Sequence, residues 1–327
     1  MELLLSIITV LITGYILVLV ALYFIHKKIF GNRFTINPLI NYYKEEDFNC
    51  VSEPLDFKIG DLNIKGKLIK PSSDIYNKEK IIVFCHGMWS SKEAYIQDAA
   101  YIASKGFLTY IFDYIGTNES DGKSIGGLAL GLKAVDYAVK FIHEKYKDLD
   151  IYLYGHSWGA FNALNSLKYN PYVKKVCAIS PFLNINTAIA GLLDPIYKPV
   201  LYNTAIIEGM KFGKYAFANS INSLKNYQGK ALIIHSKDDN IIKFNNSTKQ
   251  IYLKYKDNPN FKFVIVDNKN HNPQYCLDSI RQLNEFQAKI KTLKAEEQIE
   301  YMKTIDFSEL GKLDIDLMNQ IISFFNE

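Results

Sequence analysis

Gly155-His156-Ser157-Trp158-Gly159 follows directly on the apolar run 151–154, and this stretch says most about the fold. A serine on a sharp strand-to-helix turn can raise its hydroxyl above a sheet only where its near neighbours lack bulk, so a glycine stands two residues to either side. The preceding run has the aromatic and β-branched character of a buried strand, and residues 160–168 have helix-forming composition. The order of strand, turn and helix predicts a nucleophile elbow with Ser157 as the nucleophile; an ordinary exposed serine on a glycine turn is the alternative.

Short apolar runs alternate with helical patterns along most of the chain. Continuous apolar runs are typical of strands covered on both faces, and apolar residues at three- and four-residue spacing indicate helices. The alternation predicts an α/β fold with a mostly parallel central sheet and helices on both faces, preceded by an antiparallel hairpin that turns at Gly60-Asp61. The expected strands are 55–59, 62–69, 81–85, 107–112, 151–154, 176–179, 231–234 and 261–266, and the expected helices are 91–104, 127–146, 160–169 and 245–255.

A serine hydroxyl is a poor nucleophile at neutral pH, so it needs a base that takes its proton and a third group that orients the base. His271 fits the base because it follows the last expected strand by a short loop, from which its imidazole could reach Ser157. A surface loop histidine is the alternative. The other histidines fit less well: His26 ends an apolar segment, His143 is on a helix, His86 and His156 are turn neighbours, and His235 ends a strand.

The orienting acid is expected just beyond the strand 231–234. Asp239 lies there, so its carboxylate would emerge at the same edge of the sheet as Ser157 and His271. Asp238 is the competitor. Because adjacent residues point in different directions at a turn, only one of the two can serve. We assign Asp239 and expect Asp238 to be a solvated or capping acid.

Attack by a serine on an acyl group builds negative charge on the substrate oxygen, which two preorganised amides can stabilise. The amide of Trp158 is one candidate. The amide of Met88 is the other, because His86-Gly87-Met88 follows the strand 81–85 and the glycine lets the backbone approach a substrate. A purely structural turn at Gly87 is the alternative.

Composition narrows the classes of function. The 327 residues are 48% hydrophobic and 22% charged, which is typical of a globular chain. The net charge of +4 is small, and the lysines are scattered without an interleaved aromatic patch, so nothing supports nucleic-acid binding. The four cysteines have no metal-ligand spacing and imply no disulfide framework. The sequence signals no metal and no organic cofactor, and the oligomeric state stays open.

Residues 3–25 carry no charged side chain, which corresponds to about 35 Å of helix against a hydrocarbon core of about 30 Å. The acidic start at Glu2 and the basic flank at Lys27-Lys28 differ from a cleavable signal peptide. We expect an uncleaved, single-pass transmembrane anchor over residues 1–28 and a polar connector over 29–54. The basic flank favours a cytoplasmic location for the catalytic domain, residues 55–327.

Two further segments interrupt the alternation of strands and helices. The apolar stretch from about 181 to 227 is interpreted as a small cap over the active site. A charged helical insertion at about 275–310 follows His271, and we expect it to be extra surface helix without an assigned function. The apolar pattern after residue 316 predicts a closing helix.

With these motifs in place, residues 55–327 resemble the α/β-hydrolase superfamily. The order Ser157, Asp239, His271 is that superfamily's triad order, and the loop 113–122 is similar to its loop after the fourth strand, where Asp113 is usually structural. More narrowly, the chain resembles membrane-anchored bacterial hydrolases of the serine aminopeptidase-like or monoglyceride lipase-like group. The resemblance implies an α/β-hydrolase fold and a serine hydrolase activity. The insertion after His271 departs from the pattern.

Three functions remain open. We favour a carboxylic ester hydrolase with an acyl-enzyme intermediate at Ser157, acting on lipid-like or medium-chain acyl esters, because an apolar cap and a membrane anchor suit amphiphilic substrates. An aminopeptidase-like activity would need acids that hold a substrate amine, for which the cap offers Asp194 and Glu208. A non-catalytic, membrane-tethered binding protein would more naturally lack one triad residue.

Overall fold

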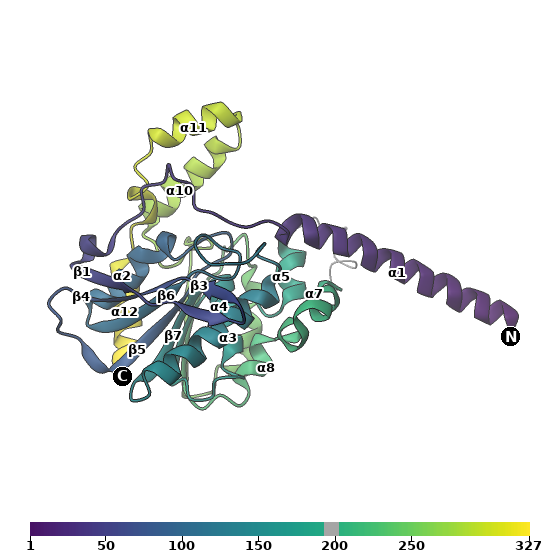
Figure 1. Cartoon of the computed structure of the whole chain (residues 1–327), viewed down its shortest axis with the longest axis horizontal. Helices are drawn as coiled ribbons and strands as arrows, with labels where there is room; N and C mark the ends of the chain where they lie inside the picture. Colours follow the sequence, from purple (N-terminus) through teal and green to yellow (C-terminus); the bar gives the residue numbers. More distant parts are fainter. Residues whose placement is uncertain (193–202) are drawn as a thin grey trace.

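The computed structural model describes residues 1–192 and 203–327. An eight-stranded sheet forms the centre of the molecule, in the order β1-β4-β6-β5-β7-β8-β9-β10. The strands from β6 to β10 pair in parallel, whereas β4 runs antiparallel to both of its neighbours, β1 and β6. Helices cover both faces of the sheet (Figure 1). The predicted α/β fold with a mostly parallel sheet is confirmed.

Most predicted elements are present with shifted ends. The strands of the central sheet are β1 (Cys50–Pro54), β4 (Gly66–Pro71), β5 (Asn77–Cys85), β6 (Phe107–Phe112), β7 (Asp150–His156), β8 (Lys175–Ile179), β9 (Lys230–Ser236) and β10 (Phe261–Val266). The α-helices are α1 (Glu2–Phe30), α2 (Ile96–Ser104), α3 (Leu128–Lys145), α4 (Trp158–Ser166), α5 (Ile185–Leu192), α7 (Thr204–Phe212), α8 (Ser220–Leu224), α9 (Thr248–Tyr255), α10 (Leu277–Ile290), α11 (Ala295–Lys303) and α12 (Ile315–Asn326). Short 3₁₀ helices are η1 (Glu45–Phe48), η2 (Glu93–Tyr95), η4 (Gly213–Phe217), η5 (Phe244–Asn246) and η6 (Glu309–Gly311).

The sheet separates two apolar cores, because successive side chains of a strand point to opposite faces. In β5, Ile81 and Val83 belong to the core that α3 and α4 complete. Ile82 and Phe84 belong to the core that α2 and α12 complete. All four side chains are fully buried. Burial on both faces is why the strand is a continuous apolar run. Polar side chains can therefore gather only where the strands end, at the carboxyl edge of the sheet.

The start of the sheet differs from the predicted hairpin. The turn at Gly60 is present, with a φ of 61°, but the second expected strand is divided. Its first part, β3 (Leu62–Ile64), pairs with β2 (Phe57–Ile59) in a separate two-stranded sheet, and its second part is β4. The sequence also gave no sign of β1, whose side chains after Cys50 are exposed, because an edge strand needs no apolar run.

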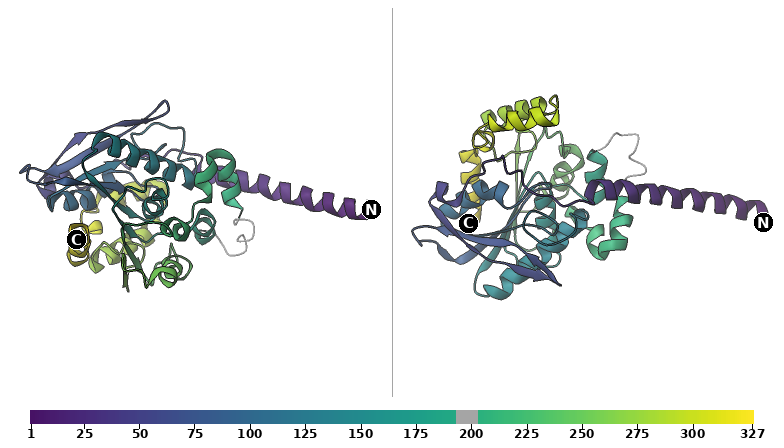
Figure 2. Two further views of the ribbon diagram at one scale, coloured as in Figure 1. Left: turned by 90° about the horizontal axis from the view of Figure 1, so that it is seen from below. Right: turned by 45° about the horizontal axis from the view of Figure 1, so that its top comes forward.

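Helix α1 projects from the body, and its last turns lie against helix α7 (Figures 1 and 2). Its side chains are exposed from residue 1 to residue 17, whereas Leu22, His26 and Phe30 are buried. Nε2 of His26 lies 3.1 Å from the carboxylate of Glu208 on α7, and both side chains are buried. That carboxylate also accepts the amides of Leu128 and Ala129 at the start of α3. Glu208 therefore joins α1, α7 and the start of α3.

Candidate active site

The strand–turn–helix motif folds as a tight elbow between β7 and α4. Ser157 has a φ of 57° and a ψ of −117°, a backbone conformation that costs energy for any residue except glycine. A Cβ atom on Gly159 would overlap the carbonyl oxygen of Cys85, and one on Gly155 would overlap the carbonyl group of Gly159. Both glycines are thus required by packing at the turn. The elbow places the Ser157 hydroxyl at the carboxyl end of the sheet.

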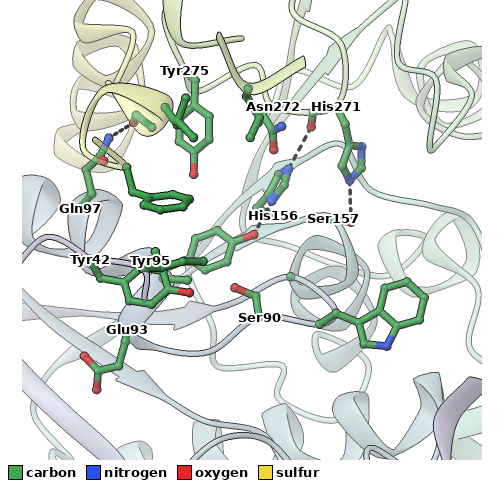
Figure 3. A pocket seen from close by; sticks show the side chains of 18 of the residues that line it. Tyr42, Ser90, Glu93, Tyr95, Gln97, His156, Ser157, His271, Asn272 and Tyr275 are labelled. Carbon is green, nitrogen blue, oxygen red and sulfur yellow. Dashed lines mark hydrogen bonds between the residues drawn. The ribbon is translucent and has the colours of Figure 1, made fainter. Parts of the chain in front are cut away.

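The structure brings the three residues of the predicted triad together. Nε2 of His271 lies 2.8 Å from Oγ of Ser157, and Nδ1 of His271 lies 2.8 Å from Oδ2 of Asp239. The three side chains follow β7, β9 and β10, whose carboxyl ends meet at one edge of the sheet. Figure 3 shows the imidazole of His271 directed at Ser157. The arrangement can pass a proton from the serine to an oriented imidazole.

Asp239 is held as a carboxylate. Its Oδ1 accepts the amides of Ile241 and Ile242 at 2.9 and 2.8 Å, and its Oδ2 lies 3.1 Å from Nε2 of His235. Burial acts to raise the pKa of Asp239, but the hydrogen bonds from His235 and His271 outweigh it and hold this pKa well below its usual range. An ionised acid at this position favours the proton on Nδ1 of His271 and leaves Nε2 free to act as a base.

The competing acid, Asp238, points elsewhere. Its Oδ1 accepts the hydroxyl of Ser236, and its Oδ2 accepts the amide of Asn270 at 3.2 Å. These contacts join the loop after β9 to the loop that carries His271. Asp238 therefore supports the loops, and within the described part of the chain it makes no hydrogen bond to the imidazole of His271.

A second histidine supports the backbone of the first. Nε2 of His156 donates to the carbonyl oxygen of His271 at 2.9 Å, and Nδ1 of His156 accepts the hydroxyl of Tyr95 at 2.6 Å. Burial lowers the pKa of His156 to about 3, so the ring is neutral and the tautomer that these two bonds require is the one present. Ser180 donates to the same carbonyl. Figure 3 shows this chain from Tyr95 through His156 to the loop of His271.

Tyr95→Phe is expected to lower kcat about tenfold to a hundredfold, because small misplacement of a catalytic group has effects of this size. The change removes only the hydroxyl that donates to Nδ1 of His156. This buried nitrogen is then left without a partner, which should lower the free energy of unfolding by about 1–3 kcal/mol. Steady-state kinetics and denaturant unfolding of the two proteins test this. Tyr101→Phe is the matched control, since its hydroxyl donates to Asn319 away from the site. Equal kcat losses in both variants would contradict a positioning role for Tyr95.

The two residues predicted to supply amide donors lie close to the site: Trp158 follows Ser157 in the chain, and Met88 lines the cavity that Ser157 lines. The amide of Trp158 lies in the first turn of α4, where helix N–H groups have no intrahelical acceptor. Met88 lines the same cavity as Ser157. Its turn is fixed by His86, which donates from Nδ1 to the carbonyl of Gly87 at 2.7 Å and stacks on Tyr114 at 3.9 Å between ring centroids. The amides of Met88 and Trp158 therefore stay the predicted donors to a substrate oxygen.

A cavity of about 500 Å³ opens over Ser157 and His271, within the range usual for small-molecule sites. Aromatic and aliphatic side chains supply most of its wall. Glu93 is its only carboxylate among the described residues, and it is paired with Lys67 at 3.1 Å and Lys92 at 3.3 Å. No cluster of three or more histidine, cysteine or acidic side chains that could hold a metal occurs in the described part of the chain.

Sequence reasoning missed part of this cavity. Its described lining includes residues 40–43 of the connector and six residues of the insertion after His271, but none from the predicted cap at 181–227. A signal was present in α10, where Ile280, Leu283 and Phe286 recur at three-residue spacing within an otherwise charged segment. Tyr95 and His156 carried no comparable signal, because their contacts join elements that are distant in sequence.

Comparison with known proteins agrees with the fold. Residues 76–212 match the family model described as serine aminopeptidase, S33. An esterase from Pyrococcus furiosus superposes with a TM-score of 0.57 at 18% identity, covering 83% of this chain and 98% of that one. Est1E from Butyrivibrio proteoclasticus, in a structure with ferulic acid bound, gives 0.52 at 18% identity and covers 72% and 98%.

A putative dipeptidyl aminopeptidase IV from Bacteroides ovatus gives a TM-score of 0.54 at 17% identity over 75% of this chain and 36% of that one. Comparison with curated protein sequences gives no significant match. The esterases and the peptidase share the fold, and the family model adds a hydrolase relationship over the segment that holds the elbow. This chain has the α/β-hydrolase fold.

Proposed function

We propose that the protein is a membrane-anchored serine hydrolase that cleaves carboxylic esters through an acyl-enzyme on Ser157. The hydrogen-bonded series Ser157–His271–Asp239, with 2.8 Å at each step and an apolar cavity above it, is the observation that carries this proposal. A fold shared with esterases supports it. Complete retention of the three side chains favours a catalyst over a non-catalytic binding protein.

In the first half of the reaction, Oγ of Ser157 attacks the ester carbonyl carbon while Nε2 of His271 takes the hydroxyl proton. The amides of Met88 and Trp158 stabilise the charge on the carbonyl oxygen. The C–O bond to the alcohol then breaks, and the alcohol leaves with the proton from His271. In the second half, water attacks the acyl group, gives a proton to His271, and Oγ leaves with that proton as the acid is released.

The charges near the site favour an ester over an N-terminal peptide substrate. A substrate amine needs an unpaired acid close to the cavity. Glu93 is already paired with two lysines, and Glu208 is buried between His26 and the start of α3. Asp194, the other acid that the sequence suggested, lies outside the described residues. No free carboxylate of the described lining is left to bind an ammonium group.

Helix α1 supports a membrane location. It is 29 residues long, and a mean hydropathy of 2.8 over its apolar window makes it long and apolar enough to span a bilayer. Because its last turns pack on α7, the cap would lie at the membrane surface. The basic side chains Lys27 and Lys28 at its body end favour a cytoplasmic catalytic domain. If an impermeant thiol reagent labels a cysteine engineered on the surface of the catalytic domain in intact cells, the cytoplasmic location is contradicted.

The full chain in lipid nanodiscs provides the test. We expect turnover of p-nitrophenyl acyl esters, no turnover of aminoacyl p-nitroanilides, and covalent labelling by a fluorophosphonate, which reacts with activated serines. Turnover of the anilides alone would establish the peptidase alternative. Folded protein that neither turns over any substrate nor reacts with the probe would favour the binding protein.

A further inference from the structure

We propose that the insertion after His271, together with the connector before the sheet, forms the wall that binds an extended apolar chain of the ester substrate. This inference rests on the proposed function and names the substrate class of the same site. The insertion comprises residues 277–311, with helices α10 and α11 and the short helix η6. The connector contributes residues 40–43.

The insertion faces the cavity and leaves the domain core almost untouched. Ser279 and Ile280 are the only buried residues of α10, and α11 has none. Both helices stand away from the sheet (Figures 1 and 2). Nevertheless Leu283, Phe286 and Phe307 line the cavity over Ser157. A segment that adds little to the core and supplies apolar side chains to the site is best explained by contact with substrate.

The apolar side chains of this wall support one another. The ring of Phe286 packs edge-on against Phe307 at 5.4 Å between centroids and stacks on Tyr301 at 5.9 Å. Phe286 and Phe307 are half-buried, so each presents part of its ring to the cavity. Tyr42 and Tyr275 line the same space, and Figure 3 shows Tyr275 beside the loop of His271 and Tyr42 near Glu93. An apolar chain of the substrate would bury this exposed aromatic surface.

The wall is fixed to the body at its base and its sides. At the stem, the amide of Cys276 donates to the carbonyl of Lys312 at 2.8 Å, and Ser279 donates to the carbonyl of Glu309 at 2.6 Å. Gln97 of α2 donates to the carbonyl of Gly311, which Figure 3 shows as a dashed line. These hydrogen bonds attach the insertion firmly to the body of the domain.

The connector completes the wall from the membrane side. The hydroxyl of Tyr43 donates to the carbonyl of Ser308 at 2.9 Å, and the side-chain Nδ2 of Asn37 donates to the sulfur of Met302 at 3.3 Å. The connector begins at the body end of α1 and passes beneath the insertion (Figure 1). The cavity wall is therefore continuous with the chain that leaves the anchor, which suits a substrate whose apolar chain comes from a lipid phase.

The test compares chain-length profiles of the full protein in nanodiscs. One series of esters varies the acyl chain from two to twelve carbons with p-nitrophenol constant, and a second varies the alcohol with acetate constant. The double variant Phe286→Ala and Phe307→Ala is expected to lower kcat/KM for the ten- and twelve-carbon substrates of one series at least about tenfold. The two-carbon substrate should change less than about twofold. The series that responds shows whether the acyl or the alcohol chain occupies the wall.

Ile299→Ala is the matched control, because Ile299 is an exposed apolar residue of the same insertion that does not line the cavity. Leu283→Trp is the second variant: it keeps the helix and fills the space, so it should also reduce only the long-chain rates. Equal losses at all lengths, or unchanged long-chain rates in both cavity variants, would overturn the inference and leave the proposed function standing. No hydrolysis of any ester by the wild-type protein would overturn both.

Discussion

Ser157→Ala is expected to lower kcat for ester hydrolysis on the order of 10⁶-fold, the size of effect seen when a serine nucleophile is removed. The change deletes only Oγ, the atom that lies 2.8 Å from Nε2 of His271. The fold should persist, because alanine and serine share the same backbone preferences at a φ of 57°. The lost hydrogen bond should reduce the free energy of unfolding by about 1 kcal/mol.

Ser157→Gly gives this prediction a matched control. It removes the same nucleophile but also relieves the strain at the elbow, since glycine adopts this φ without steric cost. We expect the glycine variant to be as inactive as the alanine variant. Its free energy of unfolding should exceed that of the alanine variant by about 1 kcal/mol, because the relief of backbone strain outweighs the extra entropy of glycine in the unfolded chain.

Ester hydrolysis, fluorophosphonate labelling and denaturant unfolding of the three proteins give the required values. Activity within tenfold of wild type in either variant would remove Ser157 from the proposed mechanism. Equal stability of the two variants would show that the elbow is less strained than its backbone angles indicate.

The features that sequence reasoning predicted well are local. The elbow depends on two glycines within five residues, and each is needed because the backbone of Cys85 or Gly159 occupies the space of a Cβ. The parallel strands are continuous apolar runs because helices cover both faces of each strand. Polar residues directly after such strands must gather at one edge. Local pattern and sheet geometry thus sufficed to bring Ser157, Asp239 and His271 to one place.

The features that were missed depend on contacts between distant segments. Glu208 was considered as an amine-binding acid, but the structure uses it to accept amides of α3 and to pair with His26, 182 residues earlier. The cavity wall joins the connector to an insertion more than 260 residues later, through Tyr43 and Ser308. Edge strands such as β1 carry no apolar run. No window of local sequence contains these pairings.

Asp239→Asn is expected to lower kcat about 10⁴-fold through the wrong tautomer of His271. The reason lies in how the two carboxylate oxygens are used. Oδ1 accepts the amides of Ile241 and Ile242, so the oxygen of an asparagine would stay on that side. Its NH₂ group would then replace Oδ2 and face Nδ1 of His271, which lies 2.8 Å from Oδ2 in the native chain.

An NH₂ group donates and cannot accept, so Nδ1 would become the acceptor and the ring proton would move to Nε2. A protonated Nε2 cannot take the proton of Ser157. Because hydrogen bonds from His235 and His271 outweigh burial and lower the pKa of Asp239, the native side chain stays ionised throughout the neutral range, and the loss should be the same from pH 6 to pH 8, on the order of 10⁴-fold.

Asp238→Asn is the control that separates the two adjacent acids. Asp238 supports the loops through Ser236 and the amide of Asn270, and an asparagine oxygen can keep one of these bonds. We expect its kcat to fall less than about tenfold. Since the variants have the same charge change one residue apart, their ratio of kcat values reports the orienting role alone. A larger loss in Asp238→Asn than in Asp239→Asn would transfer that role to Asp238 and would contradict the proton path proposed here.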